Sequence, residues 1–243
     1  MPEFSNLLLD IEGTVTSISF VKDTLFPCAY EAVEHFIREH FDDSPVAKII
    51  DDLRQVSEEE SKLDSNIRLV RESKEECIED ITHNVRHWIN IDKKITPMKA
   101  LQGLIWEEAY RKGDVKGHVY PDVLPALQAL SVPTYIYSSG SVLAQKMLFG
   151  HSIVGDLTKI LSGHFDTNVG LKEDSNSYTK ICEQINVKPS DVLFLTDVEA
   201  EARAARAAGL QTMLVVRDGN APLSDEAKRE FPTIRSLEEL HDF

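Results

Sequence analysis

Hydrophobic positions along the chain follow two different periods, and the change of period divides the sequence. Short runs of apolar or β-branched residues, bounded by turn or helix signals, occupy Leu7–Asp10, Thr134–Ser138, Val192–Asp197 and Thr212–Val216. Runs of this length and composition predict buried strands. The first of these strands lies far from the other three in the sequence.

Helical signals separate the last three strands. They cover Gln145–Phe149, Tyr178–Ile185 and Glu199–Ala208. The last segment is rich in alanine, carries its arginines late and stops at Gly209, as the C-terminal end of a helix does. Strands that alternate with helices build βαβ units, so the sequence predicts an α/β fold with a doubly wound parallel sheet.

The stretch between the first and second strands has a helical period instead. Its apolar residues recur in three groups, Ala29-Val33-Phe36-Ile37, Val46-Ile49-Ile50-Leu53 and Cys77-Ile78-Ile81-Val85-Trp88-Ile89. These spacings predict amphipathic helices. We expect an α/β core of residues 1–18 and 119–243, with residues 19–118 forming a helical cap inserted after the first strand.

The composition limits the partners. The 243 residues carry a formal net charge of −15, whereas nucleic acids and anionic membranes both require a basic footprint. We therefore expect neither as a partner. The same negative field would oppose the approach of a phosphate ester, so positive charge has to be supplied locally, by a divalent metal ion and one or two lysines.

The sequence also carries expectations about the compartment. We expect no secretory signal, because the first residues lack a basic segment, and no stretch is long and apolar enough to span a bilayer. Cys28, Cys77 and Cys182 are odd in number and widely spaced, which is typical of reduced thiols. We expect a cytosolic protein, and the sequence leaves a nuclear pool open.

Two carboxylates follow the first predicted strand. Asp10 ends the apolar run, Glu12 comes two residues later, and Gly13 follows at once. In an open α/β sheet, chemistry is located at the carboxyl ends of strands. Two acids there are costly to hold together unless a cation or a phosphoryl group shares the site. The alternative interpretation is a strand that runs into an acidic turn.

Hydroxyl groups end the second predicted strand. Ser138 and Ser139 are followed by Gly140, Ser141 and a helix. Hydroxyls and main-chain N–H groups in this position can cradle a phosphate oxygen, although a serine there can also serve only as the N-cap of the helix. Lys172 lies in a later loop, residues 169–175. Its importance comes from its place in the order of these motifs along the chain.

Asp197 ends a third predicted strand. Glu199 and Glu201 follow it as a helix begins, and acids in a first helical turn are common because of the helix dipole. These two glutamates therefore have a structural explanation, and whether Glu201 assists a metal ion is left open. Parallel strands would bring Asp10, Ser138 and Asp197 to one edge of the sheet.

The order strand–Asp-x-Glu, strand–Ser, Lys, strand–Asp resembles the haloacid dehalogenase (HAD) superfamily along the whole chain, with the helical insert in the first of the usual cap positions. The closer similarity is to its enolase-phosphatase branch, also called acireductone synthase, of methionine salvage. The segments that carry it are Leu9–Thr16, Leu101–Trp106, Tyr135–Ser141, Gly163–Thr167 and Leu193–Val198. Glu12 replaces the Asp usual in superfamily phosphatases, which agrees with this branch.

The resemblance implies a nucleophile, an acid and a metal ion. Asp10 would attack the phosphorus and form an aspartyl-phosphate that water hydrolyses. Glu12 would protonate the leaving oxygen. One Mg²⁺ per subunit would be held by Asp10, a main-chain carbonyl near Glu12, and Asp197, and would reduce the repulsion between nucleophile and phosphate.

The resemblance also implies a substrate. Ser138 and Ser139 would donate hydrogen bonds to the transferring phosphoryl group, and Lys172 would neutralise its developing charge. The small-molecule phosphate ester would be 5-methylthio-2,3-dioxopentyl 1-phosphate, which one site enolises and then dephosphorylates to the acireductone. We expect the chain to act as a monomer.

Four alternative interpretations remain beside the enolase-phosphatase interpretation. Another HAD phosphatase, acting on sugar phosphates or nucleotides, would share the fold. A phosphoryl-accepting receiver module would lack the large insert and would not place its phosphoacceptor on the first strand. A haloacid dehalogenase needs no Mg²⁺, which leaves Glu12 and Asp197 hard to justify. A catalytically silent scaffold predicts a broken motif, and none of the four is visibly broken.

Overall fold

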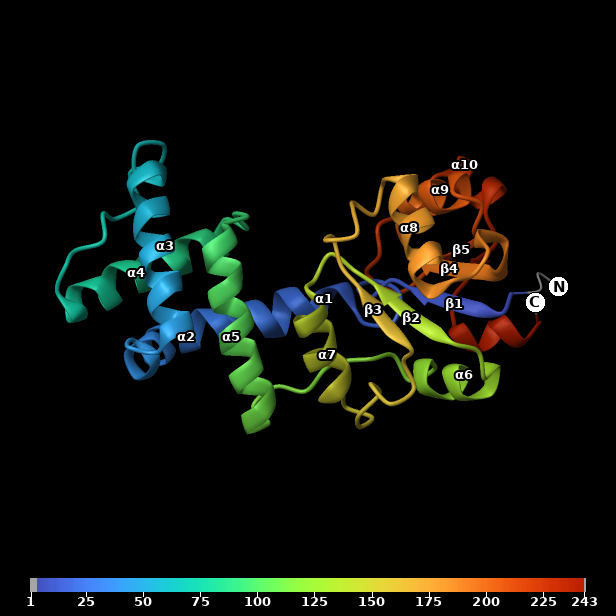
Figure 1. The fold of residues 1–243 in the computed structure, drawn as a ribbon, viewed down its shortest axis with the longest axis horizontal. Helices are drawn as coiled ribbons and strands as arrows, with labels where there is room; N and C mark the ends of the chain where they lie inside the picture. The colour runs from blue at the N-terminus through green and yellow to red at the C-terminus, as the bar shows by residue number, and fades with distance from the viewer. Residues whose placement is uncertain (1–3, 243) are drawn as a thin grey trace. The chain divides into compact units, whose positions relative to one another are not determined.

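The structure is a computed structural model that describes residues 4–242. The chain divides into two compact units, one of residues 1–20 with 116–243 and one of residues 21–115 (Figure 1). Each unit has its own hydrophobic core, as independently packed bodies do. The division at residues 18/19 and 118/119, and the role of the insert as a cap, stay predictions.

A parallel sheet forms the centre of the first unit. Its six strands lie in the order β3-β2-β1-β4-β5-β6, and each neighbouring pair is parallel. The strands are β1 Asn6–Leu9, β2 Thr134–Tyr137, β3 Gly163–Phe165, β4 Val192–Thr196, β5 Gln211–Val215 and β6 Thr233–Ile234. The order runs outward from β1 in both directions, so the predicted doubly wound parallel sheet is confirmed.

Helices cover both faces of this sheet. Figure 1 shows α8 and α9 on one face and α6 on the other. On the first of these faces, Leu8 and Phe194 of the sheet pack with Ile181 of α8 and Ala205 of α9. The helical elements of this unit are α1 Ile18–Phe20, α6 Val123–Leu130, α7 Val142–Gly150, α8 Ser175–Ile185, η2 Pro189–Asp191, α9 Glu199–Ala207, α10 Asp225–Glu230 and η3 Leu237–Asp242.

Some elements of this unit lie outside the sequence predictions. β3 has three residues and β6 has two, which is too short for an alternating pattern to be recognised. α6 carries Pro125 in its first turn, where the missing N–H has no helical acceptor in any case. α7 begins earlier than predicted because Ser141 caps it, its Oγ accepting a hydrogen bond from the Ala144 N–H at 3.2 Å.

The second unit is helical, as predicted. Its elements are the π-helical turn η1 Val21–Leu25, α2 Phe26–His40, α3 Ser44–Glu60, α4 Lys74–Asn90 and α5 Thr96–Lys112. The periodic apolar residues of the sequence form its buried core, which includes Val33, Leu53, Ile81 and Trp88. Burial of these helical faces, more than intrinsic helix propensity, is what stabilises such a unit.

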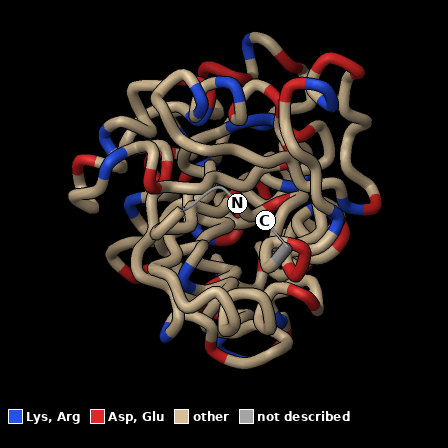
Figure 2. Tube along the Cα trace, turned by 90° about the vertical axis from the view of Figure 1, so that its right-hand side faces the viewer, with Lys and Arg blue, Asp and Glu red and all other residues tan. Residues whose placement is uncertain are grey.

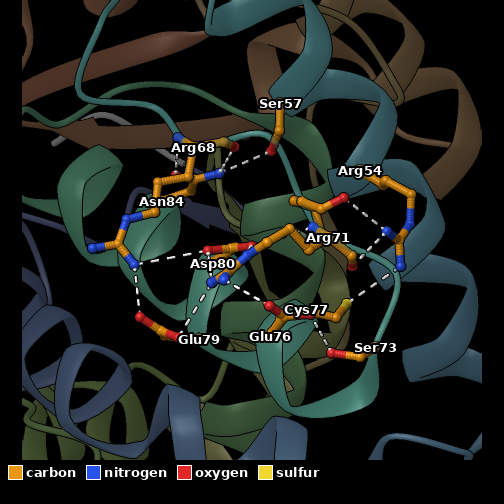
Figure 3. A network of polar contacts seen from close by, with 11 residues as sticks. Arg54, Ser57, Arg68, Arg71, Ser73, Glu76, Cys77, Glu79, Asp80 and Asn84 are labelled. Carbon is orange, nitrogen blue, oxygen red and sulfur yellow. Dashed lines mark hydrogen bonds and ion pairs between the residues drawn. The ribbon is translucent and has the colours of Figure 1, made fainter.

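A polar network fixes the irregular segment 61–73 between α3 and α4 (Figure 3). The guanidinium of Arg71 donates to both carboxylate oxygens of the buried Asp80, at 2.7 and 2.9 Å, and holds the pKa of that carboxyl below its usual value. Arg54 of α3 donates to the main-chain carbonyls of Val70 and Arg71, at 2.9 Å each. Segment 61–73 is therefore held in place by side chains of α3 and α4.

Charge of both signs is distributed over the described chain. Figure 2 shows Lys and Arg interspersed with Asp and Glu along the trace in that view. Within residues 4–242, no helix is both long and apolar enough to cross a bilayer.

Candidate active site

The carboxyl ends of β1, β2 and β4 lie side by side. Leu9 is in register with Ile136 of β2 and with Leu195 of β4, and the Asp10 N–H continues the ladder by donating to the Leu195 carbonyl at 2.9 Å. Asp10, Ser138 and Asp197 follow these three strands directly. The structure therefore places them at one edge of the sheet, at the point where the strand order reverses, which is where open α/β sheets bind ligands.

Lys172 is buried against two carboxylates. Its ammonium nitrogen lies 2.5 Å from Asp10 Oδ1 and 2.7 Å from Glu201 Oε2, and only 7% of its side chain is exposed. Burial alone would lower the pKa of this lysine. The two carboxylates raise it by more than burial lowers it, so the net shift of the pKa is upward. Lys172 is therefore a charged group beside Asp10, the nucleophile that the sequence predicts.

The loop that carries Lys172 is tied to α8. Tyr178 Oη donates to the Lys172 carbonyl at 2.6 Å, and Ser177 Oγ donates to the Leu171 carbonyl at 2.8 Å. Gly170 has a φ of 146°, and a Cβ there would overlap Ser177 Oγ. Because only glycine tolerates both constraints, this position allows the loop to pack closely enough on α8 to deliver the lysine.

Asp197 faces the same centre without a cation of its own. Among the ion pairs of the described residues, Lys172 engages Asp10 and Glu201 but not Asp197. Burial, together with the charge of Asp10, raises the pKa of Asp197 to about 7. Gly13, at a φ of 73°, approaches so closely that a Cβ there would overlap the Asp197 carboxylate. A positively charged ligand would relieve this concentration of negative charge.

Glu201 belongs to this centre, and the sequence interpretation missed its role. It is buried, accepts a hydrogen bond from Thr196 Oγ1 at 2.7 Å and pairs with Lys172. Burial and the charge of Asp10 raise its pKa. The available signal was its place in the sequence: Glu201 lies four residues after Asp197, in the first turn of the helix that follows β4.

The two predicted phosphate-binding serines differ in environment. Ser138 is buried, and its Oγ accepts a hydrogen bond from the Gly140 N–H at 3.2 Å, which leaves its hydroxyl proton to donate. Ser139 is exposed. The helix cap that competed with a functional interpretation is Ser141, so capping does not account for Ser138.

Glu12 lies in the turn that follows Asp10. The turn is closed by hydrogen bonds from the Val15 N–H to the Ile11 carbonyl at 2.9 Å and from the Gly13 N–H to the Thr16 carbonyl at 2.8 Å. Asp10 is buried, whereas the side chain of Glu12 is exposed. The side chain of Glu12 is thus at the surface of the first unit, whereas Asp10, the predicted nucleophile, is not.

The donor set at this edge suits a hard divalent cation. Two carboxylates, Asp10 and Asp197, and the main-chain carbonyl of Glu12 supply oxygen ligands of the kind that Mg²⁺ prefers. Elsewhere in the described residues, the ligand atoms of Glu39, His40 and Glu108 lie close enough together to hold an ion. There His40 is paired with Asp43 and Glu108 at 2.7 and 2.9 Å, so ordinary ion pairing explains the contact.

The chain is similar to known proteins over nearly its whole length. A family model for hydrolases, described as haloacid dehalogenase-like hydrolase, matches residues 4–209. Enolase-phosphatase E1 of Caenorhabditis elegans is 63% identical over 98% of the chain and 97% of that protein, and its Drosophila melanogaster counterpart is 46% identical over 97% and 92%. The crystal structure of the UTR4 protein from Saccharomyces cerevisiae superposes with a TM-score of 0.76 at 34% identity, covering 96% of this chain and 98% of that one.

Proposed function

The chain belongs to the enolase-phosphatase E1 family of haloacid dehalogenase-like hydrolases, and on that basis we propose that it is a Mg²⁺-dependent bifunctional enolase-phosphatase of methionine salvage. It converts 5-methylthio-2,3-dioxopentyl 1-phosphate, through its enol phosphate, to 1,2-dihydroxy-5-methylthiopent-1-en-3-one and phosphate. The observation that carries this proposal is the buried pair of Asp10 and Lys172 at the switch point of the sheet, 2.5 Å apart. We further propose a cytosolic monomer.

Asp10 is the nucleophile of the phosphatase step. One of its carboxylate oxygens forms a bond to phosphorus as the ester P–O bond breaks, and the departing oxygen takes the proton of Glu12. Water then attacks the phosphorus of the aspartyl-phosphate, gives its proton to the Glu12 carboxylate and releases inorganic phosphate. Asp10 and the protonated Glu12 are both regenerated, so atoms and charges balance over the cycle.

The remaining residues bind and orient the phosphoryl group. Lys172 places its ammonium beside the attacking oxygen, where it stabilises the charge that develops on the phosphoryl group. Glu201, held by Thr196, keeps that ammonium in place. The hydroxyls of Ser138 and Ser139 donate hydrogen bonds to the phosphoryl oxygens.

Asp10, the main-chain carbonyl of Glu12 and Asp197 fit a Mg²⁺ ion. When bound, the ion screens the nucleophile from the phosphate oxygens and polarises the carbonyl whose neighbouring carbon loses a proton. The elevated pKa of Asp197 supports this assignment, because burial beside Asp10 leaves that carboxylate in need of a cation.

Removal of divalent cations is expected to abolish phosphate release. Without a cation, Asp10 and Asp197 repel both each other and the incoming phosphate. The measurement is phosphate release before and after exhaustive chelation, followed by addition of Mg²⁺ as the control for irreversible damage. Undiminished release from the chelated protein would contradict the proposal.

Replacement of Glu12 by Gln is expected to block phosphate release and to leave enolisation in place. Gln keeps the shape and polarity of the side chain but cannot transfer a proton, so the enol phosphate should accumulate and absorb in the near ultraviolet. Enolisation removes a proton from C1, the carbon that carries the ester oxygen, and we assign this proton to a group other than Glu12. A matched control is Glu183→Gln, on the exposed surface of α8.

Two results decide the role of Glu12. Loss of both steps in Glu12→Gln would assign both protons to this carboxyl. Wild-type phosphate release by the variant would remove Glu12 from the mechanism.

The substrate is tested by comparing the rates at which different phosphate esters are hydrolysed. Mg²⁺-dependent kcat/KM for phosphate release is measured on the diketo phosphate and on a panel of sugar phosphates and nucleotides. We expect the diketo phosphate to be preferred, because its two adjacent carbonyls acidify the C1 proton that the enolase step removes. Higher kcat/KM on a sugar phosphate or a nucleotide would keep the fold and the nucleophile and replace the proposed substrate.

A further inference from the structure

The turn after β1 is held in place by residues that are distant in sequence. The Gly13 carbonyl accepts a hydrogen bond from Asn220 Nδ2 at 2.9 Å, and the Thr14 carbonyl accepts one from Arg217 Nε at 3.1 Å. The Val15 carbonyl accepts from the Tyr120 N–H at 2.9 Å. Three successive carbonyls of this turn are therefore bound by groups from outside it.

Arg217 is fixed on every side. Its two terminal nitrogens donate to the two carboxylate oxygens of Asp122, at 3.0 and 2.8 Å, and one of them also donates to the Arg235 carbonyl at 2.8 Å. Its guanidinium lies over the ring of Tyr120, 4.2 Å from the centroid. Only 7% of the Arg217 side chain is exposed. The bidentate pair with Asp122 fixes the orientation of the guanidinium as well as contributing interaction energy.

Asn220 is directed at the turn by its own loop. Arg217, Asp218, Gly219 and Asn220 form a turn after β5 in which the Asn220 N–H donates to the Arg217 carbonyl at 3.2 Å and Gly219 has a φ of 90°. The side-chain amide nitrogen of Asn220 also donates to the Val215 carbonyl, at 3.2 Å. The end of β5 and the turn after β1 are thus joined by one amide group.

The peptide between Glu12 and Gly13 is the part of this turn that concerns the metal ion. Its N–H points into the turn, to the Thr16 carbonyl at 2.8 Å. Because a trans peptide is planar and its N–H and C=O point in opposite directions, the Glu12 carbonyl points out of the turn. Gly13 also lies against the Asp197 carboxylate, so the position of Gly13 affects two of the three proposed metal donors.

We propose that Arg217 and Asn220 are positioning residues for the metal site: by holding the Gly13 and Thr14 carbonyls they fix the direction of the Glu12 carbonyl and the space beside Asp197, and so set the affinity for Mg²⁺. This inference rests on the proposed function, since it concerns the same site. Replacement of a residue that hydrogen-bonds to a metal ligand and orients it commonly lowers metal affinity or activity by about 10- to 100-fold.

The test is Mg²⁺ binding to the full chain in the absence of substrate, by isothermal titration calorimetry. Arg217→Lys keeps the positive charge but removes the planar guanidinium that donates to both Asp122 and the Thr14 carbonyl. Asn220→Ala removes the side-chain amide that donates to the Gly13 carbonyl. Each is expected to raise the Kd for Mg²⁺ by about 10-fold or more. Arg229→Lys, an exposed arginine on α10, is the matched control and should leave the Kd unchanged.

A second readout separates positioning from general destabilisation. If the two residues position metal donors, saturating Mg²⁺ restores kcat in the variants, whereas loss of folded protein would lower kcat equally at every Mg²⁺ concentration. Circular dichroism establishes that each variant is folded at the assay temperature. If Arg217→Lys does not fold, Asn220→Ala decides the result.

An unchanged Kd for Mg²⁺ in a folded Asn220→Ala variant would overturn the inference, as would loss of kcat that saturating Mg²⁺ does not restore. The calorimetric result does not depend on the identity of the substrate. If the wild-type chain does not turn over the diketo phosphate and the variants still bind Mg²⁺ more weakly, the proposed substrate is rejected and the positioning role is supported.

Discussion

Asp10→Asn is expected to abolish phosphate release while the chain remains folded. The amide has the shape of the carboxylate but cannot form the aspartyl-phosphate, and removal of a covalent nucleophile from a hydrolase costs on the order of 10⁴- to 10⁶-fold in kcat. The main-chain hydrogen bond from residue 10 to Leu195 is unaffected by the change, and Lys172 keeps Glu201 as its partner. The measurement is steady-state kcat with a preparation free of wild-type protein.

A matched control for this variant is Asp51→Asn, which makes the same chemical change at an exposed position of α3. It is expected to have wild-type kcat. Substantial activity in Asp10→Asn, above the level that contaminating wild-type protein could explain, would reject Asp10 as the nucleophile.

The second large effect is expected from Lys172→Met. Methionine has a similar length but no charge, so Asp10 and Glu201 would face each other in a buried site without the cation that both now contact. Breaking a buried ion pair from one side costs about 3–5 kcal/mol of stability, and loss of one charge-stabilising donor costs about 10²- to 10³-fold in kcat. Thermal unfolding without Mg²⁺, together with kcat/KM, measures both effects.

Lys180→Met is the matched control for this lysine. Lys180 is exposed on α8, and its ammonium group donates a long hydrogen bond to the Val169 carbonyl, at 3.4 Å. It should leave both the unfolding midpoint and kcat/KM unchanged. Wild-type kcat/KM in Lys172→Met would show that the ammonium group has no part in phosphoryl transfer.

The parts of the site that could be predicted from the sequence are those with a local signal. Asp10, Ser138 and Asp197 each follow an apolar run directly, and parallel strands oblige such residues to meet at one edge. Lys172 has no local signal and was identified from the order of motifs in a known superfamily. The structure brings it to Asp10, at a sequence separation of 162 residues.

The parts that could not be predicted depend on tertiary contacts. Glu201 in the first turn of a helix looks like an acid placed there by the helix dipole, and only its burial beside Lys172 distinguishes it from the partly exposed Glu199. Arg217 and Asn220 lie in a short polar loop that sequence alone describes as a surface turn. Their contacts with the turn after β1 span more than 200 residues of sequence, which no local pattern records.

The central claim, that one site enolises its substrate and then removes the phosphate, is tested most directly by a single turnover with excess protein over the diketo phosphate. Near-ultraviolet absorbance and inorganic phosphate are followed on the same sample, with Mg²⁺ present. We expect absorbance from the enol phosphate to rise first and phosphate to appear as this intermediate is consumed. Phosphate release from the intact diketone, with no preceding rise in absorbance and no acireductone as product, would contradict the claim.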